Sequence, residues 1–198
     1  MINHMKKIFW LVVVLLFLTS CTNQSVHHDV ENNITTDDDN LIQEEAQNYE
    51  EFRTTTWSIE YNDTKFFVQN QTDNSAAFAL IEEVYQNRND ASVYLSISFQ
   101  NGMSADESSD IAATTESEAG ADTKVDVSLI NGMEIPHVHI AWGESDSSTL
   151  YDVYYFDDAA GCYALTLCYY TAATDTWMKE MMDMVNSFSI VSVKHGTG

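Results

Sequence analysis

The sequence predicts an α+β domain in which an antiparallel β-sheet meander packs with two helices. Three observations lead to this prediction. From Trp57 onward, short runs alternate apolar and polar side chains, as strands with one buried face do. The dipeptide Asn131-Gly132 separates two such runs and favours a tight hairpin turn. Two segments, beginning near Ser104 and Thr174, have helical spacing instead of alternation.

The expected strands follow one another with short turns between them. We place them at 57–61, 66–69, 78–85, 93–99, 124–130, 135–142, 150–157, 162–170 and 189–193. In the run at 124–130, alternation assigns three apolar side chains to the inward face, namely Val125, Val127 and Leu129. Strands joined by short turns run antiparallel, so this order predicts one hairpin after another.

Both helices carry signals at their ends or along one face. Ser104-Ala105-Asp106-Glu107 is a capping box, and Gly120 is a suitable C-terminal stop. The second helix has an apolar stripe at helical spacing, formed by Trp177, Met178, Met181, Met184, Val185 and Phe188. Core packing explains the methionines of this stripe without a metal ion. Each helix is therefore expected to pack against the sheet.

Residues 1–21 have the features of a lipoprotein signal peptide. Lys6 and Lys7 precede an apolar run at 8–18, and small residues lead to Cys21. The apolar run is shorter than the roughly 20 residues that a membrane-spanning helix needs. Bacterial lipoproteins as a class resemble this segment, and the resemblance implies lipidation of the Cys21 thiol after export. We therefore expect a lipid-anchored chain at the cell membrane that faces the extracytoplasmic side.

Residues 22–52 are expected to form a disordered acidic tether, and residues 53–198 a single globular domain. The tether is rich in Asn, Asp, Glu, Gln and Thr and contains the run Asp37-Asp38-Asp39. Its last part, at 41–52, also has the spacing of a short amphipathic helix. The whole chain has a net charge of −23, and loss of the leader removes Lys6 and Lys7. Such a polyanion is repelled by phosphates, which argues against nucleic acid as a partner.

Several segments have a characteristic order and local sequence: the opening strand at 57–61, the turn Asn131-Gly132-Met133, the strand pair at 151–156 and 161–167, and the closing segment at 184–190. These segments resemble the PsbP-like group, which includes the extrinsic subunit of photosystem II in the thylakoid lumen. The resemblance covers residues 57–191. It implies a PsbP-like α-β-α sandwich and a role in binding or assembly without catalysis.

His137 and His139 are the candidate ligand-binding residues. Alternation places both on the face opposite Val138 and Ile140, about 7 Å apart along the strand. Two imidazoles at this spacing can share one metal ion, although no third ligand stands nearby in the sequence. The simpler interpretation is two half-exposed strand histidines. We therefore assign no cofactor and keep a metal-binding or small-ligand-binding lipoprotein as the alternative.

Cys162 and Cys168 are expected to be free thiols. They lie six residues apart in one strand, which separates them by about 20 Å, whereas a disulfide joins Cα atoms at roughly 4.4 to 6.8 Å. No neighbouring cation or CxxC spacing indicates a redox site.

The sequence also contains none of the common catalytic motifs, such as G-x-S-x-G, H-E-x-x-H or a P-loop. The expected function is a non-catalytic binding or assembly module at the cell envelope. Its partners would be the membrane, through the lipid on Cys21, and an envelope protein or polymer. Tyr94, Tyr154 and Tyr170 are candidate contacts wherever they are exposed.

Overall fold

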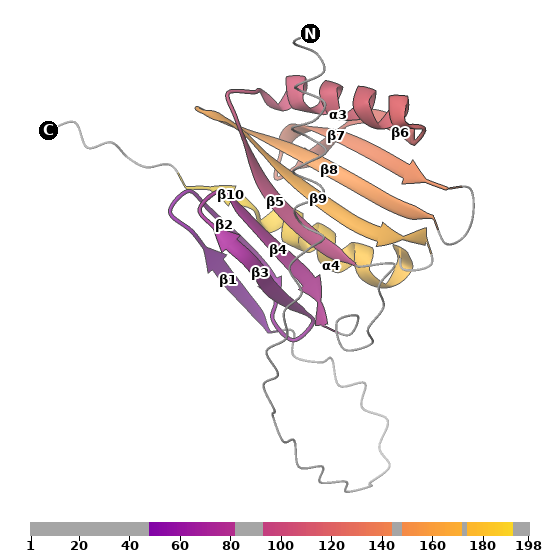
Figure 1. The fold of residues 1–198 in the computed structure, drawn as a ribbon. Helices are drawn as coiled ribbons and strands as arrows, with labels where there is room; N and C mark the ends of the chain where they lie inside the picture. Colours follow the sequence, from indigo (N-terminus) through magenta and orange to yellow (C-terminus); the bar gives the residue numbers. More distant parts are fainter. Residues whose placement is uncertain (1–47, 82–92, 144–147, 172–173, 192–198) are drawn as a thin grey trace, which may run out of the picture. The chain divides into compact units, whose positions relative to one another are not determined.

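The computed structural model describes residues 48–81, 93–143, 148–171 and 174–191. Within these residues the chain forms two antiparallel sheets and two helices, α3 (Ala105–Ala119) and α4 (Thr174–Ser187) (Figure 1). The strands are β1 (Tyr49–Arg53), β2 (Trp57–Asn62), β3 (Phe66–Thr72), β4 (Ser75–Leu80), β5 (Tyr94–Asn101), β6 (Asp122–Ile130), β7 (Met133–Trp142), β8 (Thr149–Asp158), β9 (Gly161–Tyr170) and β10 (Ser189–Ile190). The predicted α+β class is therefore confirmed.

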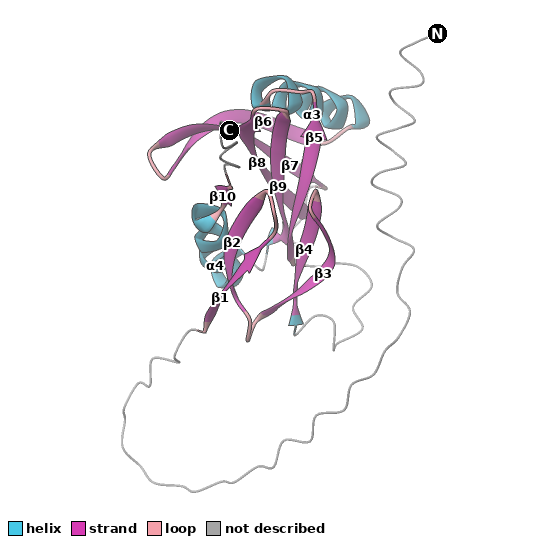
Figure 2. Ribbon diagram, turned by 90° about the vertical axis from the view of Figure 1, so that its left-hand side faces the viewer, coloured by secondary structure: helices cyan, strands magenta, loops and turns pink. Residues whose placement is uncertain are grey.

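The larger sheet has seven strands, in the order β3-β4-β5-β9-β8-β7-β6. Consecutive strands pair as hairpins, but β5 pairs with β9, so that Asn101 lies opposite Gly161. After β5 the chain passes through α3 to the far edge of the sheet, where β6 begins (Figure 2). The sheet therefore consists of two runs of hairpins joined at β5 and β9. The sequence predicts a meander that the helices interrupt, but it does not predict that the crossover through α3 carries the chain to the far edge and leaves β5 paired with β9.

The smaller sheet pairs β1 and β10 with the two edges of β2. The β1 strand includes four residues of the predicted tether, 49–52, which also had the spacing of a helix. Phe52 explains the difference, because its ring lies 5.4 Å from that of Trp57 and 5.8 Å from that of Phe78, centroid to centroid. One aromatic side chain thus attaches this polar segment to the core.

The helix α3 begins and ends where the sequence predicts. The Ser104 side chain accepts a hydrogen bond from the backbone N–H of Glu107 at 3.2 Å, which satisfies a free donor at the helix N-terminus. At the other end, Gly120 has a φ of 104°, a left-handed conformation that glycine adopts without strain. Ala105, Ala112 and Ala113 are buried on the side of the helix that faces the sheet. These small side chains let α3 lie close to the sheet.

The helix α3 covers only part of one sheet face. The apolar cluster beneath it contains Ala105, Ala112, Ala113, Ala121, Val138, Ile140, Val153, Tyr155, Cys162 and Ala164. Cys162 and Cys168 are buried and are not joined in a disulfide, as predicted. Burial raises the pKa of the Cys162 thiol, whose Sγ lies 3.1 Å from the Ser108 Oγ. These observations indicate that Cys162 packs as a small apolar residue.

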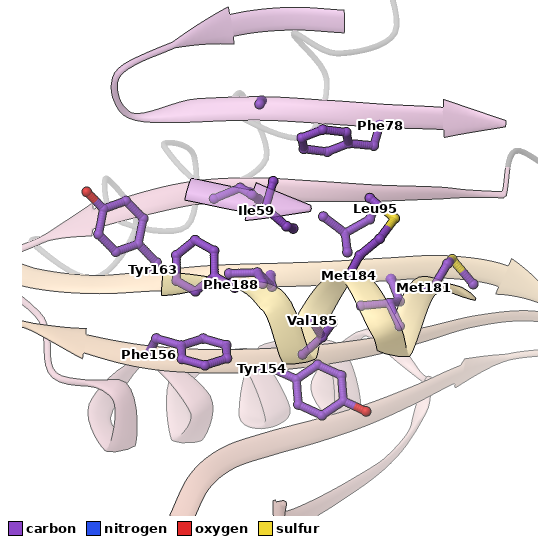
Figure 3. Packing of buried hydrophobic residues seen from close by; sticks show 14 of the residues in the cluster. Ile59, Phe78, Leu95, Tyr154, Phe156, Tyr163, Met181, Met184, Val185 and Phe188 are labelled. Carbon is purple, nitrogen blue, oxygen red and sulfur yellow. The ribbon is translucent and has the colours of Figure 1, made fainter. Parts of the chain in front are cut away.

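The main core lies on the opposite face, between the larger sheet, α4 and the smaller sheet. The helix supplies Met181, Met184 and Val185 to this core, and Phe188 follows directly after it (Figure 3). Phe188 lies between the rings of Phe156 and Tyr163, at centroid distances of 4.9 and 5.7 Å. The predicted apolar stripe is therefore the buried side of α4.

The hairpin of β6 and β7 turns at Asn131-Gly132, as predicted. Both residues have positive φ, 50° and 78°, which is the requirement of a type I′ turn. The prediction that Val125, Val127 and Leu129 point into the core is wrong, because these side chains are 50%, 61% and 72% exposed. They share one face of β6, as alternation predicts, and this face is on the α3 side of the sheet, but α3 covers the neighbouring Val138 and does not cover this row.

Candidate functional site

His137 and His139 lie on β7 and face the α4 side of the sheet. Across the β7–β8 pairing, His137 stands opposite Tyr154 and His139 stands opposite Asp152. The intervening Val138 is fully buried on the α3 side, so the alternation predicted for this strand is confirmed. The side chain of His137 is 16% exposed and that of His139 is 37% exposed. The two rings therefore lie at the margin between core and solvent.

One carboxylate holds both histidines. The Oδ1 atom of Asp152 lies 2.7 Å from Nε2 of His137 and 3.0 Å from Nδ1 of His139. The Tyr169 hydroxyl donates a hydrogen bond to the second oxygen, Oδ2. We call these four residues the Asp152 cluster. Every member is on the same face of three adjacent strands, which is why the cluster forms although its residues span 137–169.

The Asp152 carboxylate is buried, with a side chain 8% exposed. Burial raises its pKa, but the hydrogen bonds from His137, Tyr169 and His139 outweigh that effect and hold the pKa at about 2. Burial and the hydrogen bond to Asp152 also raise the pKa of the Tyr169 hydroxyl. Asp152 is therefore a charged acceptor held among donors, and Tyr169 stays protonated as one of those donors.

The cluster is connected to the main core through Tyr154. Its ring stacks on His137, with centroids 4.5 Å apart and an angle of 8° between the planes. Its hydroxyl donates to Sδ of Met182 at 3.3 Å. Because Tyr154 is buried, it does not supply the exposed contact considered from the sequence, and Tyr94 and Tyr170 are only partly exposed.

The geometry gives no support to a metal site at these histidines. Each imidazole directs one nitrogen to Asp152, which leaves Nδ1 of His137 and Nε2 of His139 for other contacts. In the part of the chain that the structure describes, no group of three or more His, Cys, Asp or Glu residues is arranged to hold a metal ion. The carboxylate instead orients the two rings. Asp152 and Tyr169 were missed from the sequence because only the strand register brings them together.

A second surface lies on β6, at the edge of the larger sheet. Val125, Val127 and Leu129 form an exposed apolar row that we call the β6 stripe. Its side chains stand opposite Val138, Pro136 and Glu134 of β7. Within the described residues, β7 is the only strand that pairs with β6, so the other edge of β6 is open. An exposed apolar row on an open edge strand is typical of a surface that pairs with another strand.

The opposite row of β6 is polar and locally neutral. Nζ of Lys124 lies 2.7 Å from Oδ2 of Asp126. The other oxygen of Asp126 accepts a hydrogen bond from the backbone N–H of Val127 at 2.8 Å. The stripe therefore lies in a segment whose two charges neutralise each other.

Cys21, the predicted signal peptide and residues 22–47 of the predicted tether lie outside the described residues. Among the helices of the described residues, none is long and apolar enough to cross a bilayer.

Comparison with known proteins gives no family model and no curated protein that matches the chain. Two solved structures are similar in fold. The solution structure of cyanobacterial PsbP (CyanoP) from Synechocystis sp. PCC 6803 has 10% identity and a TM-score of 0.49, and the match covers 77% of this chain and 98% of that one. A crystal structure from Bacteroides thetaiotaomicron VPI-5482 has 12% identity and a TM-score of 0.43, over 69% of this chain. The matched region spans 45% of the Bacteroides chain.

Proposed function

We propose that the chain is a lipid-anchored envelope lipoprotein whose domain is a non-catalytic binding or assembly module on the extracytoplasmic side. The leader supports the anchor, since two lysines, an apolar run and small residues precede Cys21. The alternative partner class, nucleic acid, is disfavoured by the net charge of −23. An envelope protein or polymer is the partner that fits this setting.

The β6 stripe is the observation that carries the binding role. Three apolar side chains that are at least half exposed lie side by side on an open strand edge. Most surface apolar residues occur singly and need no explanation. A contiguous apolar row on an edge strand is normally either absent or used as a contact surface for a partner. The stripe therefore supplies apolar contacts for a partner, and its open edge supplies main-chain hydrogen-bonding groups, with Asp126 as the competing acceptor for the Val127 N–H.

The Asp152 cluster is assigned a structural role in this proposal. Its carboxylate already receives donors from His137, His139 and Tyr169, and it is buried. A catalytic carboxylate would need to reach a substrate, but these contacts occupy both of its oxygens. The cluster fixes the register of β7, β8 and β9 and thereby holds the β6–β7 hairpin that presents the stripe.

The PsbP-like α-β-α arrangement belongs to the same proposal. It is supported by the sequence phrases at 57–61, 131–133, 151–156 and 184–190, which fall on β2, the β6–β7 turn, β8 and the junction of α4 with β10. In the described residues, α3 and α4 lie on opposite faces of the larger sheet.

The anchor is tested by replacing Cys21 with alanine and fractionating cells. We expect the wild-type chain in the membrane fraction, with the mass of the cleaved chain plus acyl groups on Cys21. The Cys21→Ala chain should lose both the acyl mass and the cleavage. An uncleaved wild-type leader, or a cleaved chain without acyl mass, would overturn the anchor.

The binding surface is tested with a photoreactive amino acid in place of Leu129, which is 72% exposed. Asp110 on α3, which is also exposed, is the matched control position. Irradiation of intact cells should give defined higher-mass adducts from position 129 and none from position 110. Equal labelling at the two positions, or no adduct from position 129, would contradict a binding role for the stripe.

A further inference from the structure

We infer that β6 pairs antiparallel with β6 of a second copy of this chain, about a two-fold axis that passes through Val127. This inference rests on the proposed binding role of the β6 stripe and names its occupant. The pairing would join two seven-stranded sheets into one continuous sheet across the interface.

The pattern of the β6 stripe is self-complementary. A two-fold interface requires that when one residue contacts a second, the second contacts the first in return. With the axis at Val127, this residue faces its own copy, and Val125 faces Leu129 of the second copy on either side. The three exposed apolar side chains of β6 are thus covered by one another. Apolar pairs of this kind are the units that stabilise antiparallel pairing.

The polar row of β6 tolerates the same register. In this register Asp126 stands opposite Ser128 of the second copy, and Lys124 stands opposite Ile130. No like charges face each other directly, which would destabilise a pair of strands. Within each copy Lys124 also pairs with Asp126 at 2.7 Å. Although the chain has a net charge of −23, the segment 124–130 is neutral. The local charge therefore does not oppose a second copy at this site.

The β6 edge is also regular and firmly held. All nine residues of β6 pair with β7 in one uninterrupted register, from Asp122 opposite Ala141 to Ile130 opposite Met133. The turn is attached to the end of α4, because the Asn131 side-chain amide donates to the Asn186 carbonyl. The other edge strand of this sheet, β3, has a register shift between Gln69 and Thr72. Such irregularities hinder edge pairing, so β6 is the edge suited to it.

A cysteine at the axis tests the pairing directly. Directly opposite Cα atoms in an antiparallel pair are about 4.5 or 5.5 Å apart, and both distances suit a disulfide. Val127→Cys should therefore give a disulfide-linked dimer when intact cells are treated with a mild oxidant. Val125→Cys is the matched control, because the two copies of position 125 lie four residues out of register, about 13 Å apart. The control and the wild-type chain, which retains Cys21, Cys162 and Cys168, should give only background.

A second measurement does not depend on cysteine chemistry. The mature chain, purified from membranes in detergent, should sediment as a dimer, and Val127→Lys should shift it to a monomer because two like charges meet at the axis. Since each copy is strongly acidic, added salt should increase the dimer fraction of the wild-type chain. Asp110→Lys on the exposed side of α3 controls for the added charge, and circular dichroism checks that each variant is folded.

The outcomes separate this inference from the binding role itself. Adducts from position 129 at twice the chain mass, together with the Val127→Cys dimer, support both. Adducts to a different protein, with no Val127→Cys dimer above background, preserve the binding module and overturn self-pairing. A folded wild-type chain that stays monomeric at high salt also overturns self-pairing. A dimer that crosslinks through position 125 as strongly as through position 127 overturns the stated register.

Discussion

The ring of Tyr154 lies nearly parallel to the imidazole of His137, with 4.5 Å between the ring centroids. The two residues stand directly opposite each other on β8 and β7. Their contact connects the Asp152 cluster with the main core, since Tyr154 belongs to that core. The Asp152 cluster therefore lies at the margin of the core, and its hydrogen bonds all depend on the Asp152 carboxylate.

Asp152→Asn should lower the free energy of unfolding by about 2 to 3 kcal/mol, the usual range for hydrogen bonds to a buried charged group. The substitution keeps the size of the side chain but removes its charge and directs an amide donor at groups that need an acceptor. Chemical denaturation measures the effect. Asp126→Asn is the control and should change stability far less, because Asp126 is exposed. Equal stability of Asp152→Asn and the wild-type chain would contradict the role of the cluster.

The stability of the fold should also depend on pH through Asp152. Its pKa is about 2 in the folded chain, against an ordinary value of 3.8, because hydrogen bonds from its partners stabilise the charged form. A lowered pKa stabilises the fold above pH 4, and this contribution is lost as the pH falls toward 2. The linked free energy is about 2 kcal/mol. Unfolding measured between pH 2 and pH 6 should show a steeper decline for the wild-type chain than for Asp152→Asn. Parallel curves would argue against this carboxylate as the source.

Replacement by alanine should destabilise the fold strongly at one leucine of the larger sheet and only slightly at another. Leu165 is fully buried in the main core, whereas Leu129 is 72% exposed. Leu165→Ala should cost about 2 to 5 kcal/mol, because it removes buried apolar surface and leaves a cavity. Leu129→Ala should cost less than about 0.5 kcal/mol. Urea unfolding of both variants, at a protein concentration low enough for the chain to be monomeric, tests the assignment. A large loss in monomeric Leu129→Ala would return β6 to the inward orientation expected from alternation.

Gly161 should not tolerate a side chain. A Cβ atom there would lie 2.2 Å from the backbone carbonyl oxygen of Gln100, where β9 begins beside β5. Gly161→Ala should therefore lower stability by about 2 kcal/mol or more, through displacement of the paired backbone. Gly102 is the comparison, since it has free space around it but a φ of 74°. Gly102→Ala should cost about 1 kcal/mol, from backbone strain alone. Thermal unfolding compares the stability losses of the two variants. A larger loss in Gly102→Ala than in Gly161→Ala would contradict the close approach of position 161 to the Gln100 backbone.

Alternation along the strands predicted which residues share a face, but not whether that face is covered. For His137 and His139 the distinction did not matter, because Val138 between them is buried and sets both histidines on the opposite side. For Val125 and Leu129 it did matter. They are exposed because α3 covers the neighbouring part of the sheet and stops short of this row. The extent of a helix over a sheet depends on tertiary packing, which strand periodicity does not encode.

The partners of the two histidines also required the fold. Asp152 lies within an expected strand and has no local feature that singles it out, but the β7–β8 register places it opposite His139. Likewise, β1 is polar apart from Tyr49 and Phe52, so its composition predicted a tether. Helix ends were more predictable, because the Ser104 cap and the Gly120 stop act through neighbouring backbone groups. Local chemistry was readable from the sequence, whereas contacts between distant segments were not.

The crossover through α3 has a consequence for how the chain folds. Each run of hairpins closes through neighbours in sequence, but joining β5 to β9 closes a loop of about 60 residues, which carries a greater entropic cost. Contacts at long sequence separation are slow to form, so we expect the β5–β9 seam to form later than the hairpins on either side of it. Until that seam closes, the inner borders of both halves resemble open edges. The chain is therefore most prone to misfolding and aggregation before its larger sheet is complete.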